Sequence, residues 1–170
     1  MTVRCVEPGL AVNGAQYLVT CPANDELLFP HVDSCLAIAF LLVDGRIVGG
    51  HVGMQLPTSP DLDPYGNANA IANQMIGAAQ GVGITQVILA GDGNWENDFI
   101  GGRDCVASVI GISGCAHTLF VDTGAYGGGV DVSFNPRRQM MFVQQCTGGR
   151  ALVYQTPYAV INGHMIKRLP

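Results

Sequence analysis

The stretch HVDSCLAIAFLLVDGRIVGGHVGM, residues His31 to Met54, decides the fold. Its continuous apolar run from Leu36 to Val43 is typical of a strand buried on both faces. The dipeptide Asp44-Gly45 that follows favours a hairpin turn. We therefore expect residues 46–56 to form a second strand that pairs with the first.

The same stretch carries a cysteine, Cys35, just before the first strand and a histidine, His51, within the second. A loop-to-strand corner can leave a thiol partly exposed, as a nucleophile requires, and a nearby imidazole can take its proton. If Asp44 and Gly45 are the two central turn residues, His51 lies opposite Ile38, and alternation places His51 and Cys35 on opposite faces. A bulge at Gly49-Gly50, or one more loop residue, would bring them to the same face. The alternative is a core thiol and a strand histidine without chemistry.

The rest of the chain predicts a single domain over residues 1–170 that mixes strands with two helices. Apolar spacing of three and four predicts a helix from Asn67, as its cap, to about Gly81. Residues 1–30 are expected to be a lead-in with one strand, 16–21, before the turn-rich segment PANDELLFP. The other expected elements are strands at 86–91, 117–122, 130–135, 139–146 and 151–155 and a helix at 103–112. The fold class is thus α/β or α+β with a mixed sheet.

The charge and hydrophobicity of the chain exclude some classes of binding partner. The net charge of −5 argues against nucleic acid and anionic membranes, which do not attract an acidic surface. The longest apolar run is too short to span a bilayer, and no export signal of the Sec type is visible. We expect a cytoplasmic protein, or one secreted by a Sec-independent route, that acts on a protein. The six cysteines are widely scattered, and most are expected to be buried thiols.

Four segments in order resemble the chemoreceptor glutamine deamidases of the CheD family. They are DSCLAIAFLLVDGRIVGGHVGMQLP, QVILAGDGNW, FIGGRDCVASVIGISG and FVDTGAYGGGVDVSFNPRRQMMFVQ, spanning Asp33 to Val143. The family has a Gly-Ser-Cys before an apolar strand, a Gly-Gly-x-x-His, a strand that ends in Gly-Gly, and an Asp-x-Gly-Gly loop before a closing hairpin. The catalytic domains of cytotoxic necrotizing factor-like toxins share this fold. The resemblance implies mixed sheets packed between helices, in an α/β/β/α arrangement.

The resemblance also implies an activity. Cys35 would be the nucleophile and His51 the general base of a protein-glutamine deamidase that needs no metal or cofactor. Main-chain N–H groups at Ser34 and Cys35 would hold the oxyanion. If an amine replaced water, the same site would catalyse transglutamination.

The sequence departs from the family at two positions near the cysteine. Phe29 stands where the family has a threonine that orients the histidine, and Asp33 replaces a glycine. The orienting group would then be a main-chain carbonyl, Thr20 or Asn13, and a carboxylate at position 33 is expected to raise the pKa of the thiol. The missing threonine and the lead-in favour a bacterial effector or toxin. The alternatives are a chemotaxis enzyme that acts on receptor glutamines and a non-catalytic binding module.

Overall fold

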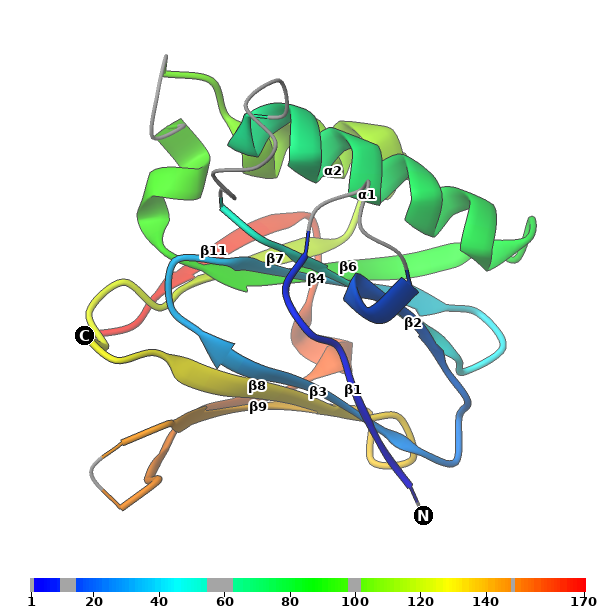
Figure 1. Ribbon diagram of the computed structural model, residues 1–170. Helices are drawn as coiled ribbons and strands as arrows, with labels where there is room; N and C mark the ends of the chain where they lie inside the picture. Colours follow the sequence, from blue (N-terminus) through cyan, green and yellow to red (C-terminus); the bar gives the residue numbers. More distant parts are fainter. Residues whose placement is uncertain (1, 10–14, 55–62, 98–101, 148) are drawn as a thin grey trace.

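The computed structural model describes residues 2–9, 15–54, 63–97, 102–147 and 149–170. Two mixed β-sheets lie face to face, and both α-helices cover the outer face of the larger sheet (Figure 1). The six-stranded sheet has the order β11 (His164–Arg168), β7 (Thr118–Asp122), β6 (Ile84–Gly91), β4 (Leu36–Leu42), β5 (Ile47–Val52) and β2 (Leu18–Cys21). The five-stranded sheet has the order β1 (Val3–Cys5), β3 (Glu26–Val32), β8 (Val130–Asn135), β9 (Met140–Gln145) and β10 (Leu152–Pro157).

Strand β4 connects the two hydrophobic cores, which is why its sequence is apolar at every position. All seven of its residues are buried. Its even-numbered side chains, from Leu36 to Leu42, pack under the helices, and its odd-numbered ones, from Ala37 to Leu41, face the five-stranded sheet. Its neighbours β5 and β6 both run antiparallel to it.

The two helices are α1 (Pro64–Ala79) and α2 (Cys105–Ser113), and each begins at an aspartate cap. The Asp63 carboxylate accepts from the Gly66 N–H at 2.6 Å. The prediction that Asn67 caps α1 is wrong, because the helix starts three residues earlier. The buried Asn67 amide instead donates to the Gly9 and Gly53 carbonyls, at 3.1 and 2.9 Å.

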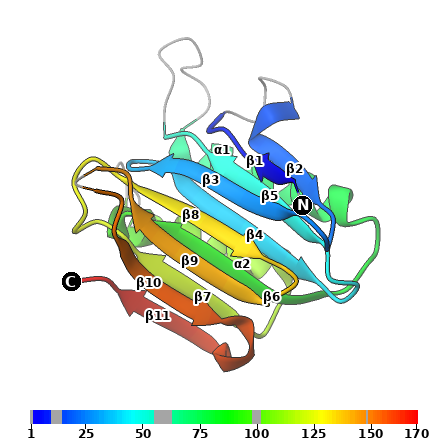
Figure 2. The ribbon, with the colours of Figure 1, turned by 90° about the horizontal axis from the view of Figure 1, so that it is seen from below.

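The mixed α+β class is confirmed, whereas helices on both outer faces are not seen. Figure 2 shows the outer face of the five-stranded sheet, which no helix of the described residues covers. Along β9 burial alternates, with Met141 and Val143 buried and their neighbours half-buried. A sheet with one apolar and one polar face packs only its apolar face against another layer, and its polar face can remain in contact with water. The described layers are therefore α/β/β.

The lead-in prediction for residues 1–30 was wrong in part. The segment PANDELLFP, expected to be turns, contains the start of β3, whose Leu27 and Phe29 enter the core. Strand β1 pairs in parallel with β3. Strand β11, at the C-terminal edge, was not predicted either. No described helix has the length and apolar character needed to cross a membrane.

Candidate active site

The register of the β4–β5 hairpin decides how Cys35 and His51 lie relative to each other. Ala37, not Ile38, lies opposite His51. Cys35 lies one residue before β4, and extending this register by one residue puts it diagonal to His51, on the side that faces the five-stranded sheet. Opposite faces, the outcome of a two-residue turn, are therefore not observed. Among the described residues, no hydrogen bond joins the Cys35 sulfur to the His51 ring.

The extra register step comes from the loop. The Leu42 N–H donates to the Arg46 carbonyl at 2.9 Å, which leaves three loop residues, 43–45. Gly45 takes a left-handed φ of +90°, the conformation that a glycine accepts without strain. From Leu36 to Leu41 the pairing with β5 is continuous. Of the two predicted alternatives, the longer loop is therefore observed and the bulge at Gly49-Gly50 is not.

The two glycines are needed for packing instead. A Cβ atom on Gly49 would lie 2.8 Å from Leu27 Cδ2 in the facing sheet. One on Gly50 would lie 2.5 Å from Met75 Sδ in α1. The absence of side chains at these positions lets the other sheet and α1 approach β5 closely on its two faces.

His51 is completely buried, and one of its ring nitrogens is fixed. Nδ1 lies 2.6 Å from the Val6 carbonyl oxygen, which can only accept, so Nδ1 carries the proton and Nε2 the lone pair. Nε2 has no hydrogen-bond partner among the described residues. Burial lowers the pKa of His51 to about 4, although the Val6 carbonyl favours the protonated ring. At neutral pH the ring is therefore neutral, with a free acceptor nitrogen.

The orienting group is thus a main-chain carbonyl, one of the three predicted alternatives. Val6 follows β1, and its own N–H donates to the Leu28 carbonyl of β3 at 2.8 Å. Phe29, at the threonine position of the resembling family, places its ring edge-on to His51, with centroids 5.6 Å apart.

The structure does not bring Thr20 to the site. Its side chain is exposed, and it pairs with Val48, whose side chain lies on the helix side of the sheet, opposite to His51. Asn13 lies outside the described residues.

Cys35 is half-buried and lines a surface cleft of about 400 Å³. Burial raises the pKa of its thiol, and the Asp33 carboxylate raises it further, as predicted for that position. The Met54 main-chain N–H and the Ser34 hydroxyl act against this rise, because both stabilise the thiolate by hydrogen bonds. The thiol and the imidazole are therefore both neutral at rest.

A buried indole holds the corner that presents Cys35. Trp95, fully buried under the helices, donates from Nε1 to the Ser34 carbonyl at 3.1 Å. A Cβ atom on Gly91 would lie 2.9 Å from the Cys35 carbonyl oxygen, so only glycine fits there. Among the described residues, no hydrogen bond is found for the main-chain N–H groups of Ser34 and Cys35.

The other wall of the cleft depends on Asp131. Its Oδ1 accepts the His31 N–H at 2.9 Å and the Cys146 thiol at 3.2 Å, and its Oδ2 pairs with Arg150. His31 has a left-handed φ of +53° at an irregularity between β3 and β8. These contacts fix the turn that leads from β3 to Cys35.

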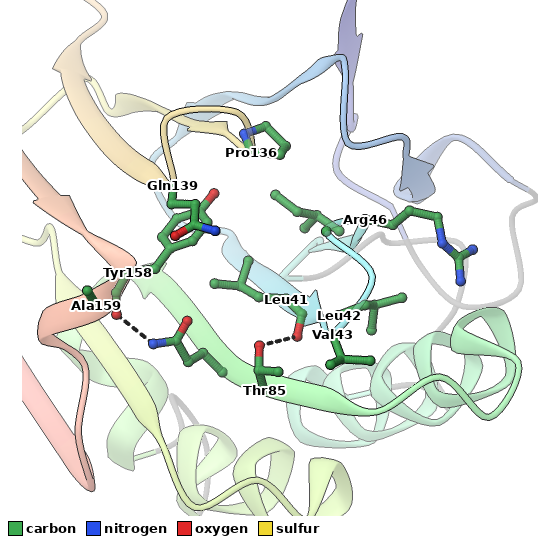
Figure 3. Close-up of a pocket in the computed structure, with 12 residues that line it drawn as sticks. Leu41, Leu42, Val43, Arg46, Thr85, Pro136, Gln139, Tyr158 and Ala159 are labelled. Atoms are coloured by element: carbon green, nitrogen blue, oxygen red, sulfur yellow. Dashed lines mark hydrogen bonds between the residues drawn. The ribbon is translucent and has the colours of Figure 1, made fainter.

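A second cavity, of about 290 Å³, lies at the far end of β4 (Figure 3). Two of its polar side chains are hydrogen-bonded: Gln86 Nε2 donates to the Tyr158 carbonyl at 2.5 Å and Thr85 Oγ1 to the Leu41 carbonyl at 3.1 Å. The buried Tyr158 hydroxyl has no hydrogen-bond partner among the described residues. No cysteine or histidine is among the described residues that line it. The Cys35 cleft is accordingly the candidate active site. No group of three or more potential metal ligands is found in the described part of the chain.

No protein-family model matches the sequence, and no curated protein matches it.

Proposed function

We propose that this protein is a cysteine-dependent protein-glutamine deamidase, with Cys35 as nucleophile and His51 as general base. One observation carries the proposal: a half-buried thiol in a cleft directly precedes the strand that pairs with the strand of a neutral, buried imidazole, whose Nδ1–H is held by the Val6 carbonyl. That tautomer leaves Nε2 as the only ring atom that can accept the thiol proton.

The chemistry follows from this arrangement. His51 Nε2 takes the Cys35 proton as the sulfur attacks the carboxamide carbon of a glutamine side chain, and the Ser34 and Cys35 N–H groups stabilise the oxyanion. The C–N bond then breaks, His51 returns the proton, and ammonia leaves. Water, deprotonated by His51, hydrolyses the thioester to glutamate and the free thiol. Because thiol and imidazole start neutral, the thiolate forms during attack and is not present at rest.

Two further parts of the proposal concern the substrate. A protein is favoured over nucleic acid because the chain carries a net charge of −5. An effector or toxin that acts on another cell's protein is favoured by the absence of the family's threonine, and a chemotaxis role is the alternative. The effector role implies Sec-independent export, and the chemotaxis role implies a cytoplasmic location.

The test is a mass measurement on glutamine-containing proteins and peptides after incubation with the enzyme. Deamidation adds about 1 Da per glutamine and releases ammonia, whereas a transglutaminase incorporates an added primary amine in place of water. Cys35→Ser should abolish the change, and His51→Gln should slow it by about 10²–10⁴-fold. Cys115→Ser, which alters a cysteine outside the described lining of the cleft, should leave it intact. Turnover that survives Cys35→Ser would refute the proposal. A folded protein that modifies no glutamine would favour a binding module.

A further inference from the structure

Two carboxylates from separate segments flank Cys35 at the cleft. Glu7 follows the residue whose carbonyl holds His51, and Asp33 lies two residues before the thiol. Both are exposed and both line the cleft, and no lysine or arginine is among the described residues that line it. Within the described ranges, neither carboxylate forms an ion pair. Their negative charges therefore remain available to an incoming ligand.

Other carboxylates of the molecule do not contribute in the same way. Asp131, behind the cleft wall, is neutralised by Arg150. Glu96 and Asp122 share Arg168, at 2.7 and 2.9 Å. The unbalanced charge next to the thiol thus comes from Glu7 and Asp33.

We propose that the Cys35 cleft selects a cationic partner, a glutamine flanked by lysine or arginine, and that Glu7 and Asp33 determine this specificity. This inference rests on the proposed deamidase function for its glutamine, and on the charge distribution for its cation. Carboxylates at the entrance attract a cationic segment and repel an anionic one. The same two charges therefore strengthen binding of the preferred substrate and weaken binding of its competitors.

Charge selection would also aid the chemistry. The Asp33 carboxylate disfavours the Cys35 thiolate while the cleft is empty. A lysine or arginine of the substrate that pairs with Asp33 cancels this effect. The thiol then loses its proton more readily when the correct substrate is bound, and substrate recognition activates the nucleophile.

The first test uses two thiol reagents that differ only in charge: a cationic trimethylammonioethyl and an anionic sulfonatoethyl methanethiosulfonate. In both, the thiolate attacks the sulfenyl sulfur, a disulfide forms and methanesulfinate leaves. At pH 8, where ordinary histidines are neutral, and at low salt, we expect the cationic reagent to modify Cys35 about tenfold faster. Peptide mass mapping identifies the modified cysteine. Equal rates would overturn the inference.

Matched variants assign the preference to the two carboxylates. Glu7→Gln and Asp33→Asn should each lower the cation-to-anion rate ratio by about two- to threefold. Asp44→Asn removes the same charge at the β4–β5 turn, the opposite end of β4, and should leave the ratio unchanged. The change that Asp33→Asn causes in thiol acidity acts on both reagents and cancels in the ratio. A ratio that falls equally in all three variants would contradict a local role.

The second test measures deamidation of peptides in which one glutamine is flanked by lysine, alanine or glutamate. The lysine-flanked peptide should react fastest and the glutamate-flanked peptide slowest, and Glu7→Gln should reduce the difference. Equal turnover of all three would refute the charge selection and leave the deamidase proposal standing. If no peptide reacts while the reagent preference persists, the deamidase proposal fails and the selection of cationic partners stands.

Discussion

Protonation of His51 should destabilise the fold, because burial disfavours the charged form of the ring. Its pKa falls from 6.5 to about 4 on folding. Between these pH values the unfolded chain binds a proton that the folded protein excludes, so the free energy of unfolding decreases as the pH falls from 6.5 to 4. At about 1.4 kcal/mol per pKa unit the whole loss is about 3 kcal/mol, with about 1.4 kcal/mol lost by pH 5.5.

Urea unfolding at pH 7.5 and 5.5 measures this effect. In His51→Gln, the amide can still donate to the Val6 carbonyl but does not titrate. The difference in the free energy of unfolding between pH 7.5 and 5.5 should therefore be smaller than in wild type by about 1.4 kcal/mol. An NMR titration of the histidine rings provides a check that needs no variant: the His51 ring should not titrate between pH 8 and 5. A His51 ring that titrates near 6.5 or above would refute the neutral pair and indicate a resting thiolate and imidazolium.

Three substitutions test the packing around the site. Gly50→Ala should lower the free energy of unfolding by about 1–3 kcal/mol, because the new methyl group overlaps Met75; urea unfolding checks this value. Trp95→Phe removes the hydrogen bond to the Ser34 carbonyl, and should cost about 1 kcal/mol in urea unfolding and slow alkylation of the active-site thiol. Asn67→Leu leaves two carbonyls without their side-chain donor and should lower the thermal midpoint, with a loss of about 1–3 kcal/mol at that midpoint.

Much of the fold could be predicted because burial leaves a pattern in the sequence. The uniform apolar run of β4 and the three-and-four spacing of α1 both indicate their elements directly. Strand β3 was missed because Pro22 precedes it and Pro30 lies within it, and both suggest turns, although Leu27 and Phe29 alternate toward the core. Strand β11 was missed because all its residues are exposed, so no apolar alternation marks it.

The site was only partly predictable, for two physical reasons. The same Asp44-Gly45 dipeptide fits a two-residue or a three-residue hairpin loop, and only the second places Cys35 and His51 on one face. The group that orients His51 is the main-chain carbonyl of Val6. Because every residue has a main-chain carbonyl, the sequence does not indicate which one binds the ring. Trp95 stands in a polar stretch of sequence that suits the rim of a site or the core equally, and only the structure shows that it is buried and donates to the Ser34 carbonyl.

Alkylation by iodoacetamide, which carries a carboxamide like that of glutamine, tests the pairing of Cys35 with His51 most directly. Labelling at pH 7, followed by peptide mass mapping, gives the rate at each of the six cysteines. We predict that Cys35 reacts before the exposed Cys5 and that His51→Gln slows Cys35 at least about tenfold while leaving Cys5 unchanged. If Cys5 reacts first, or if Cys35 reacts equally fast in both proteins, His51 does not activate Cys35 and the account is contradicted.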